Sequence, residues 1–296
     1  MAETNINNKG TPFCPNCETS SSVNLKFTNK GFNVFLCLKC NNGFTYPIPN
    51  NISKYYHIYY WVSPGLLGEL KKTIFKLFQT RRKRWIYKFL SGGKILEIGA
   101  GEGDLKRTLN KKFSVTCIDS PNATLKNKDV LKVDFLKWKT KIKYDGILFW
   151  ESLEHVSTPQ KYLEKAAKLL NKNGLIFIEY PKFNSIESQL LGKYWFHLDL
   201  PRHLAHFSDN GLNILLKRSG LRPIFESGAV AFEYSIFGLS QSLLNFLGIQ
   251  STDYLKRSGN IFILFLLLPI IFFSSFFEII FLLTNQSPIR FLLAKK

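Results

Sequence analysis

Four cysteines near the start of the chain are spaced in the way that is typical of metal ligands. They form two pairs with two residues inside each pair, Cys14 with Cys17 and Cys37 with Cys40, and 19 residues separate the pairs. Two such knuckles can present four thiolates to one metal ion in a tetrahedron, which leaves no open position for a substrate. We therefore expect a structural zinc site in a zinc ribbon over residues 1–50. Two reduced turns without metal are the alternative.

The second candidate site is a glycine-rich turn that follows an apolar strand sequence. Residues 94–98 are expected to form the strand, and the turn GAGEGD at 99–104 leads directly into a helical sequence. Glycines at a strand-to-helix turn let the backbone approach a ligand and aim helix N–H groups at it. About 20 residues further on, Asp119 ends the next expected strand, where a carboxylate can accept hydrogen bonds from both hydroxyls of a ribose. The pattern predicts a cofactor of the nucleotide type.

Two more polar groups follow expected strands further along the chain. Glu151, Glu154 and His155 lie just after the strand expected over 144–150, at the edge where a doubly wound sheet binds ligands. The segment 195–207 then brings together three of the five histidines, an aspartate and an arginine. A loop of this composition, placed after the fifth strand, would cover a substrate pocket.

These candidate residues require a framework of alternating strands and helices. Short apolar sequences predict five strands in the middle of the chain, at 94–98, 114–119, 129–135, 144–150 and 174–181. Helical sequences lie between several of them, at the spacing of right-handed βαβ units. The predicted fold class is therefore α/β, with a doubly wound Rossmann-like sheet.

The motifs along this framework occur in a specific order: ILEIGAGEGD, CIDS, VDF, YDGILFWESLEHV, LNKNGLIFIEYP and WFHLDLPRHLAHFS. Over about residues 94–225 the chain resembles the class I S-adenosylmethionine-dependent methyltransferases, in the subgroup of the ubiquinone-biosynthesis O-methyltransferases. The resemblance implies S-adenosylmethionine as the cofactor. It also implies that Glu97, Gly99, Gly101 and Gly103 wrap the methionine part, that Asp119 holds the ribose, and that Asp134 and Phe135 flank the adenine.

NAD is the nearest alternative cofactor, because the glycine pattern also suits a dehydrogenase. The acidic residue Glu97, on the strand just before the glycines, argues against NAD. Its carboxylate would repel a pyrophosphate, whereas it can face a sulfonium and an ammonium group.

The resemblance also suggests roles on the acceptor side. Methyl transfer from a sulfonium is an in-line displacement, so the protein mainly positions the acceptor and can remove its proton. Some relatives use a Glu-x-x-Glu-His arrangement, here Glu151, Glu154 and His155, to hold a divalent metal such as Mg²⁺ that acidifies a catechol-like hydroxyl. Helix capping by the same residues and His155 as a general base are the alternatives. The loop candidates for contact with substrate are His197, Arg202 and His203. A purely structural loop is the alternative.

Residues 51–92 predict a basic, aromatic helical bridge between the cysteines and the glycine-rich turn. A densely aromatic stretch leads to Ser63-Pro64, a typical helix start, and apolar residues then recur at helical spacing among many lysines and arginines. This helix either packs on the following domain with its charged face in water or meets a lipid interface.

The segment 261–283 is a run of 23 mostly apolar residues. It is long enough to span a bilayer, but a proline and two serines divide it, and Glu278 would be costly at mid-bilayer. A sixth strand is expected after Gly220. A strand expected over 289–294 would complete the sheet by running antiparallel beside it, so both ends of the intervening segment must emerge on the same side. Basic residues on both flanks favour the cytoplasmic side. We expect a membrane-associated helical hairpin; a buried core helix is the alternative.

Composition limits the class of partner. Lysine and arginine outnumber aspartate and glutamate by 40 to 21, and the net charge of +19 indicates attraction to nucleic acid, acidic lipid or a phosphate-bearing substrate. The polar N-terminal residues do not resemble a secretory signal, so we expect the chain to stay on the cytoplasmic side. Five cysteines in that compartment favour metal binding or packing over disulfides.

The expected organisation is a zinc ribbon (1–50), a helical bridge (51–92), a methyltransferase domain (93–239), a hydrophobic membrane-associated insertion (240–286) and a final strand (287–296). We expect a monotopic enzyme at the cytoplasmic face of the cell membrane that O-methylates a lipid-linked or membrane-associated acceptor, such as a quinol precursor or a lipid-linked saccharide. An RNA methyltransferase that holds RNA with its ribbon and basic surface, and a non-catalytic membrane adaptor, are the alternatives. The sequence leaves the oligomeric state open.

Overall fold

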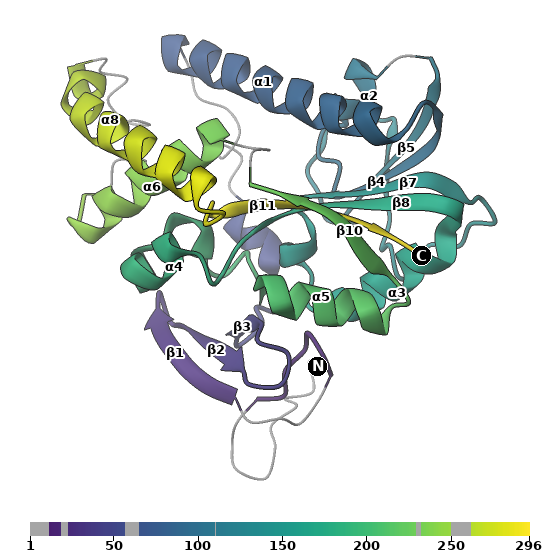
Figure 1. The fold of residues 1–296 in the computed structure, drawn as a ribbon, viewed down its shortest axis with the longest axis horizontal. Helices are drawn as coiled ribbons and strands as arrows, with labels where there is room; N and C mark the ends of the chain where they lie inside the picture. The colour runs from purple at the N-terminus through teal and green to yellow at the C-terminus, as the bar shows by residue number, and fades with distance from the viewer. Residues whose placement is uncertain (1–11, 19–22, 57–64, 110, 229–231, 250–261) are drawn as a thin grey trace.

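A computed structural model describes residues 12–18, 23–56, 65–109, 111–228, 232–249 and 262–296 of the protein (Figure 1). Its main feature is a seven-stranded sheet in the order β10-β11-β8-β7-β4-β5-β6. The strands are β4 (Gly93–Ile98), β5 (Phe113–Asp119), β6 (Val130–Lys132), β7 (Tyr144–Trp150), β8 (Leu170–Pro181), β10 (Arg222–Ser227) and β11 (Ile289–Lys295). The strands from β6 to β8 pair in parallel, which confirms the predicted α/β class.

Helices cover both faces of this sheet. Helices α1 (Gly65–Phe89) and α2 (Asp104–Thr108) lie on one face, and α3 (Pro159–Leu169) and α5 (Asp209–Arg218) lie on the other (Figure 1). Successive side chains of a strand point to opposite faces. Ile95 therefore packs into the core on the α1 side, while Leu96 packs into the core that holds Leu163 and Leu212. The sheet is doubly wound.

The order of the strands places the ligand edge. From β4 the chain adds β5 and β6 on one side, and it later adds β7 and β8 on the other side. The order reverses between β4 and β7, and at such a switch point the carboxyl ends of the parallel strands leave a crevice for ligands. The segments after Ile98, Asp119 and Trp150 all lie at this edge.

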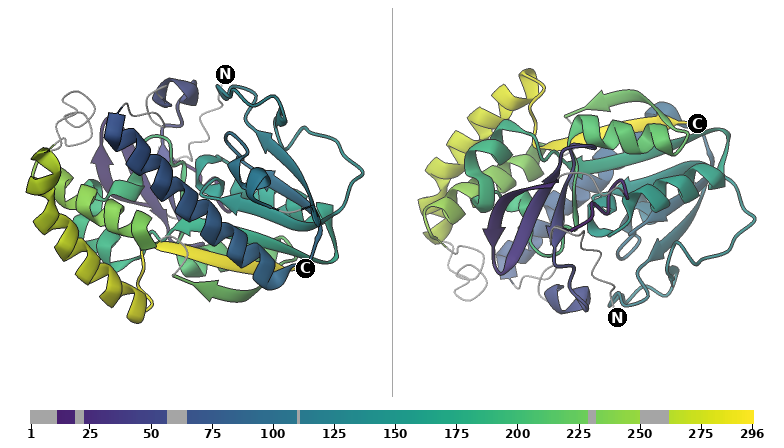
Figure 2. Two further views of the ribbon diagram at one scale, coloured as in Figure 1. Left: turned by 90° about the horizontal axis from the view of Figure 1, so that it is seen from above. Right: turned by 90° about the horizontal axis from the view of Figure 1, so that it is seen from below.

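The last strand lies where the sequence predicts it. Strand β11 is inserted between β10 and β8 and runs antiparallel to both, with Phe291 opposite Glu179 on one side and Ser227 on the other. The helices α6 (Phe232–Phe246) and α8 (Phe262–Leu283) therefore form an insertion between two neighbouring strands. They pack against each other beyond one end of the sheet (Figures 1 and 2).

Three features of the predicted bridge and hairpin lie outside the described residues. They are most of the aromatic stretch, the helix start at Ser63-Pro64 and the basic pair Lys256-Arg257. Within the ranges that the structure describes, no helix combines the length and the apolar character that a membrane crossing requires.

A second, smaller sheet contains the cysteine knuckles. Its antiparallel strands are β1 (Val23–Asn29), β2 (Phe32–Cys37), β3 (Gly43–Tyr46) and β9 (Ala205–His206). The first three strands come from the expected ribbon, but β9 comes from the histidine-rich segment that follows the fifth parallel strand. The ribbon is therefore joined to the main domain by a shared sheet, which the sequence does not predict.

Short helical elements connect the two sheets near the ligand edge. They are η1 (Ile52–Tyr55), η3 (Leu153–His155), α4 (Ile186–Leu191), η4 (Gly192–Tyr194) and η5 (Phe196–Leu198). The polar residues that the sequence singles out after β7 and β8 lie on these elements or close to them.

Candidate active site

The glycine-rich turn joins β4 to α2 at the ligand edge. Gly99 has φ +76°, and a Cβ at this position would come within 2.5 Å of the Ser152 Cβ atom, so a side chain is excluded on both grounds. The N–H of Gly99 donates to the carbonyl of Ile118 at 3.0 Å, which ties the turn to the end of β5. The turn therefore presents backbone rather than a side chain at Gly99.

Asp119 is fixed beside this turn. Its Oδ2 accepts from the N–H of Gly101 at 2.7 Å, and its Oδ1 accepts from the N–H of Ser120 at 2.7 Å. Each carboxylate oxygen retains a second lone pair, which suits acceptance from two ribose hydroxyls. The structure thus brings Asp119 and the glycines together, and the ribose contact stays a prediction.

Glu97 lies under the same turn, on β4. Its side chain is 5% exposed, and the Cys117 thiol donates to its Oε2 at 3.7 Å. Burial raises the pKa of Glu97 to about 7, while the nearby Arg82 guanidinium acts in the opposite direction. A buried carboxylate at this position can pair with a cationic ligand group, as the predicted contact with the methionine part requires.

Asp134 and Phe135 follow β6. Asp134 Oδ1 accepts from the N–H of Leu136 at 2.9 Å. The Phe135 ring is 2% exposed, and its centre lies 5.3 Å from that of the Tyr162 ring. Their contacts with an adenine stay predictions.

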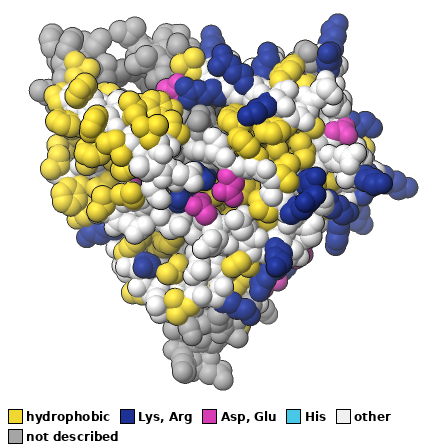
Figure 3. Space-filling model, in the orientation of Figure 1, with side chains coloured by type: hydrophobic (Ala, Val, Ile, Leu, Met, Phe, Trp, Pro, Cys, Tyr) yellow, Lys and Arg dark blue, Asp and Glu magenta, His cyan; other side chains and the backbone are white. Residues whose placement is uncertain are grey.

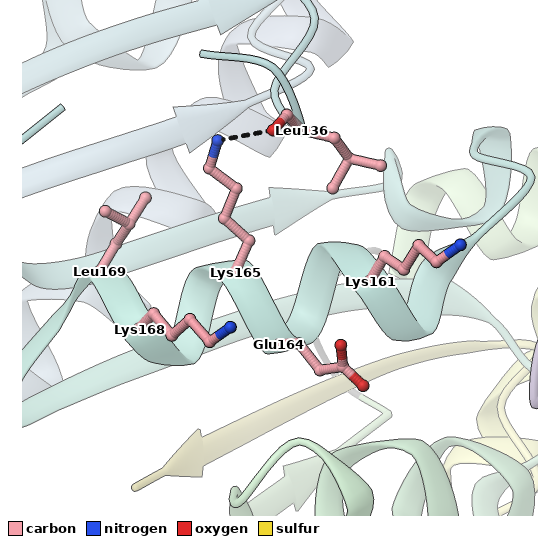
Figure 4. A pocket seen from close by; sticks show the side chains of 6 residues that line it. All are labelled: Leu136, Lys161, Glu164, Lys165, Lys168 and Leu169. Atoms are coloured by element: carbon pink, nitrogen blue, oxygen red, sulfur yellow. Dashed lines mark hydrogen bonds between the residues drawn. The ribbon is translucent and has the colours of Figure 1, made fainter. Parts of the chain in front are cut away.

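A pocket of about 390 Å³ beside this segment is lined mainly by α3 (Figure 4). Its lining consists of Leu136, Lys161, Glu164, Lys165, Lys168 and Leu169. Lys165 Nζ donates to the carbonyls of Phe135, at 2.6 Å, and Leu136, at 3.0 Å. Lys165 therefore holds the segment that follows Asp134, and none of the predicted site residues lines this pocket.

Arg82 is a site residue that the sequence motifs do not reveal. It reaches from α1 to Glu179 at the end of β8, with Nε–Oε2 and Nη2–Oε1 distances of 3.0 and 3.1 Å. Its guanidinium lies 5.4 Å from the centre of the Trp150 ring, and Nη2 lies 3.7 Å from Glu151 Oε2. The only sequence signal is that Arg82 falls on the apolar stripe of its helix, one turn before Ile86.

Glu151 belongs to this Arg82 network. Its φ is +48°, and its N–H donates to the carbonyl of Glu179 at 2.9 Å. Burial and the neighbouring Glu179 raise the pKa of Glu151 to about 8. The expected metal-binding group of Glu151, Glu154 and His155 therefore needs correction, because the Glu151 carboxylate lies beside Arg82.

The structure groups Glu154 and His155 with His203 instead. Ligand atoms of these three residues lie within 4.8 Å of one another. Glu154 is 1% exposed, and neither of its carboxylate oxygens has a hydrogen-bond partner among the described residues. Burial raises the pKa of Glu154 well above its usual value and lowers that of His155. A buried carboxyl without a partner needs either a proton or a cation.

The two histidines of this acceptor cluster, defined as Glu154, His155 and His203, are oriented by backbone carbonyls. His155 Nδ1 lies 3.0 Å from the carbonyl of Arg202, and His203 Nδ1 lies 2.8 Å from that of His197. With the proton on each Nδ1, each Nε2 keeps a lone pair for a ligand, which is the usual arrangement of metal-binding histidines. Two nitrogens and a carboxylate fit a transition-metal ion better than Mg²⁺, which prefers oxygen ligands.

Tyr56 and Arg202 complete the surroundings of the cluster. The Tyr56 hydroxyl lies 3.1 Å from His155 Nδ1, and the Arg202 guanidinium lies 5.5 Å from the centre of the Tyr56 ring. Arg202 also donates from Nη2 to Asp199 Oδ1 at 2.7 Å. Arg202 is among the predicted site residues, whereas no motif of the sequence indicates Tyr56 beside His155.

His197 does not join the acceptor cluster. Its ring is 1% exposed, lies 5.0 Å from the Tyr234 ring, and would collide with a Cβ placed on Gly238. Burial lowers its pKa to about 3, so the ring is neutral. The expected contact of this side chain with substrate is not supported, because the ring packs against α6; its carbonyl reaches the cluster through His203.

The four cysteines converge as predicted. Their sulfurs lie within 4.8 Å of one another, with 3.7 Å between Cys14 and Cys40 and 3.8 Å between Cys17 and Cys37. Four sulfurs at ~2.3 Å from a central zinc would be about 3.8 Å apart along the edges of the tetrahedron. All four side chains are buried. The geometry thus offers a closed metal site that fits zinc.

A protein-family model and two curated relatives match the middle of the chain. The family model, described as a methyltransferase domain, matches residues 70–225, more than half of the chain. The chain is 32% identical over 128 residues to the ubiquinone biosynthesis O-methyltransferase of Pelagibacter ubique (strain HTCC1062), a match that covers 39% of this chain and 52% of that protein. It is 28% identical over 104 residues to the (S)-tetrahydroprotoberberine N-methyltransferase of Eschscholzia californica, covering 30% of this chain and 30% of that protein.

Among solved structures, that of coclaurine N-methyltransferase bound to N-methylheliamine and SAH is similar at 16% identity and a TM-score of 0.45, covering 85% of this chain and 80% of that one. The chain spans about half the length of the first curated relative and about a third of the second. The family match shows that the chain belongs to the methyltransferase-domain family.

Proposed function

We propose that this enzyme methylates an oxygen atom of a lipid-linked or membrane-associated acceptor at a membrane surface. The observation that carries the proposal is the apolar outer face of the helices α6 and α8. A quinol precursor and a lipid-linked saccharide are both compatible with it. Because the chain is an enzyme, the non-catalytic adaptor loses its support.

Over residues 268–283, where its side chains are described, helix α8 buries polar residues and exposes apolar ones. Ser274 and Glu278 are buried, and Ser240 on α6 donates to Ser274 Oγ at 2.9 Å. Among the described side chains of the two helices, the large exposed apolar ones are Phe237, Phe246, Leu268, Phe272, Phe273, Phe276, Phe277, Ile279, Ile280 and Leu283. A helix that faces water has the opposite arrangement. These exposures contradict the alternative of a buried core helix.

The exposed apolar side chains gather on one end of the molecule. Figure 3 shows them over the end formed by α6 and α8. Phe272 is 71% exposed and Leu283 is 79% exposed. Soluble monomers rarely expose large contiguous apolar patches, and such patches mark contacts with membranes or partners.

Several features favour a lipid bilayer as the partner. Lys193 Nζ lies 5.1 Å from the centre of the Tyr194 ring, which packs 5.5 Å from the exposed Phe246 ring. Tyrosine and lysine beside apolar residues are typical of the membrane–water interface. The net charge of +19 suits the anionic cytoplasmic leaflet. The proposal therefore includes a monotopic position of the enzyme on the cytoplasmic face of the cell membrane.

A short path connects the apolar face to the acceptor cluster. The N–H of Phe196 in η5 donates to Ser242 Oγ on α6 at 2.8 Å, and the Phe196 ring lies 5.3 Å from the Phe237 ring. The next residue, His197, accepts from His203 Nδ1 through its carbonyl. The apolar face and the acceptor cluster are therefore linked through η5, which is compatible with an acceptor that approaches the cluster from the side of α6.

The reaction requires little covalent chemistry from the protein. The bond from the methyl carbon to the acceptor oxygen forms as the bond from that carbon to sulfur breaks, so the sulfonium becomes a neutral thioether and S-adenosylhomocysteine leaves. The acceptor hydroxyl loses its proton, and without a metal ion His155 Nε2 is the base that the geometry offers, with Glu154 beside it. A divalent ion held by the acceptor cluster would instead occupy the His155 Nε2 lone pair and would supply acidity to the hydroxyl, so that His155 would not be the base.

The membrane part of the proposal is tested with the full-length protein and lipid vesicles. Phe272→Glu combined with Phe276→Glu places two charges on the apolar face. We expect vesicle binding to fall at least about hundredfold, since each buried phenylalanine contributes roughly 1.5–3 kcal/mol. The matched control is Ile142→Glu, at an exposed apolar residue in the loop before β7. Unchanged cofactor affinity in the double variant establishes that it is folded.

The acceptor class is tested by mass spectrometry. A membrane lipid extract is incubated with the enzyme and methyl-labelled S-adenosylmethionine, and we expect a new O-methylated species in the lipid fraction. Label that enters RNA, with salt-sensitive RNA binding, would favour the RNA methyltransferase instead.

In the membrane test, vesicle binding that is unaffected by Phe272→Glu combined with Phe276→Glu would contradict the membrane assignment.

A further inference from the structure

We infer that the four-cysteine module is a positioning element for the acceptor cluster, and that its metal acts on the reaction through the backbone of the segment 203–208. The inference rests on the proposed function in one respect, namely that the cluster lies at the acceptor site. Its structural part, a link between the metal site and this segment, stands separately.

Thr45 on β3 is the central link. Its N–H donates to the carbonyl of Leu204 at 3.0 Å, and its Oγ1 donates to the carbonyl of His203 at 2.6 Å. A hydroxyl has one proton, so at its 2.9 Å contact with His206 Nε2 the Thr45 oxygen accepts from the ring N–H. Thr45 is 1% exposed. One threonine thus fixes two carbonyls and one imidazole of the histidine-rich segment.

The second knuckle continues this link. Directly after Cys40, the carbonyl of Asn41 accepts from Ser208 Oγ at 2.7 Å, and Asn42 Oδ1 accepts from the N–H of Ser208 at 3.0 Å. Ser208 is also the N-cap of α5, with its Oγ accepting from the N–H of Gly211 at 3.0 Å. The Asn42 side chain fits so closely that a Cβ on Gly211 would lie 2.0 Å from Asn42 Oδ1.

The first knuckle is joined to the other end of the same helix. Arg218, in the last turn of α5, donates from Nη1 to the carbonyl of Cys17 at 3.0 Å. Both knuckles therefore contact α5, one at its start and one at its end. A metal ion that holds the two knuckles together also fixes the distance between their contacts on α5. It thereby fixes the position of the segment 203–208, which leads into this helix.

The residues predicted to bind the cofactor lie on other elements than the acceptor cluster and the four-cysteine module. Gly101 and Asp119, which are joined by a hydrogen bond of 2.7 Å, belong to the segments after β4 and at the end of β5. Small metal-binding modules lose their fold when the metal is removed. We therefore expect loss of the metal to disturb His203 and acceptor binding while cofactor affinity is kept.

The test compares Thr45→Val with Thr45→Ser in the full-length protein. Valine removes both side-chain hydrogen bonds of Thr45, whereas serine keeps the hydroxyl. For Thr45→Val we expect unchanged zinc content, cofactor affinity within about twofold, at least about tenfold faster hydrogen exchange of the amides at 203–208, and an acceptor KM raised about tenfold. Thr45→Ser is expected to restore exchange and KM to within about threefold of the parent enzyme.

Removal of the metal is the second test of the inference. Treatment with a chelator is followed by measurement of zinc per chain, cofactor affinity by calorimetry, and hydrogen exchange at 203–208. We expect exchange in this segment to increase while cofactor affinity is kept. The inference is overturned if the segment stays protected after zinc is lost, or if the valine and serine variants exchange alike.

These readouts separate the two proposals. Hydrogen exchange and cofactor affinity need no acceptor, so they decide the structural link even when no lipid is methylated. Faster exchange in Thr45→Val without any change in acceptor KM would overturn the positioning role alone.

Discussion

Glu97 is the ionisable residue whose charge we expect to affect cofactor binding most directly. Burial raises its pKa to about 7, against the opposing effects of Arg82 on α1 and the Cys117 hydrogen bond; Asp104 and Asp119 raise it further. S-adenosylmethionine presents cationic groups, so the predicted contact with Glu97 should favour binding when Glu97 is ionised. We expect the Kd for the cofactor to rise about tenfold per pH unit below pH 7, where Glu97 becomes protonated.

Calorimetry at several pH values checks this expectation. The matched control is Glu97→Gln, which should bind the cofactor more weakly and with little pH dependence. An unchanged Kd between about pH 6 and pH 8 for the parent enzyme would show that Glu97 does not face the cofactor.

Asp119 allows a second test of a single predicted cofactor-binding residue. Asp119→Ala removes the carboxylate that would hold the ribose and leaves the Gly101 N–H without its partner. Hydrogen bonds to charged groups contribute about 1.5–3 kcal/mol, so we expect the Kd for the cofactor to rise roughly 10- to 100-fold. The control is Asp129→Ala, the same change at an exposed position before β6. Equal affinities of the two variants would contradict the assignment of Asp119.

Individual residues differ in how well the sequence predicts them. The four cysteines and Asp119 follow from local spacing, because a knuckle or a strand end fixes its own geometry. Arg82 depends on contacts between distant segments, which spacing does not reveal. The same holds for the grouping of His203, itself a predicted site residue, with Glu154 and His155. Glu151 shows the limit most clearly, since it lies close to Glu154 in the sequence but pairs with Arg82, a residue on another element.

At the scale of elements, strand β11 stabilises the fold from inside the sheet. The Phe291 ring is fully buried and lies 4.9 Å from the Trp85 ring, 5.8 Å from Trp150 and 6.1 Å from Phe177. Truncating a buried phenylalanine removes this packing and leaves a cavity. We expect Phe291→Ala to lower the free energy of unfolding by about 3–5 kcal/mol.

Denaturant unfolding measures this change. Phe272→Ala is the matched control, because Phe272 is 71% exposed. Its truncation should change the free energy of unfolding by less than about 0.5 kcal/mol. Similar losses for the two variants would show that β11 does not lie inside the sheet.

The elements themselves were largely predictable. The parallel strands and α3 have long apolar or amphipathic patterns, and the apolar run 289–294 could be assigned to the closing strand because a doubly wound methyltransferase sheet needs one. Strand β9 could not be predicted, since two residues carry no periodicity and pair only because β3 lies beside them. The burial of polar residues on α8 could not be predicted from the sequence either. Ser274 and Glu278 face inward toward α6 and α4 only in the folded chain.

At the scale of the whole molecule, positive charge and the apolar face should contribute separately to membrane binding. The net charge of +19 attracts anionic lipid, and salt screens this attraction, whereas insertion of apolar side chains is not screened. We expect about tenfold stronger binding to vesicles with anionic lipid than to neutral vesicles at low salt, and nearly equal binding at high salt.

Vesicle sedimentation at two salt concentrations distinguishes the contributions. The Phe272→Glu and Phe276→Glu double variant should lose the salt-resistant part of the binding. Complete release of the parent enzyme from both kinds of vesicle at high salt would show that charge alone holds it at the surface.

The position of β11 also has a consequence for synthesis. Its neighbours β8 and β10 are made before α6 and α8, and β11 is made after them, so the emerging chain carries two unpaired strand edges while its most apolar helices appear. Unpaired edges and bare apolar helices promote aggregation. A ribosome that pauses between the codons for Phe232 and Pro288 would hold the chain in this vulnerable form until β11 is made.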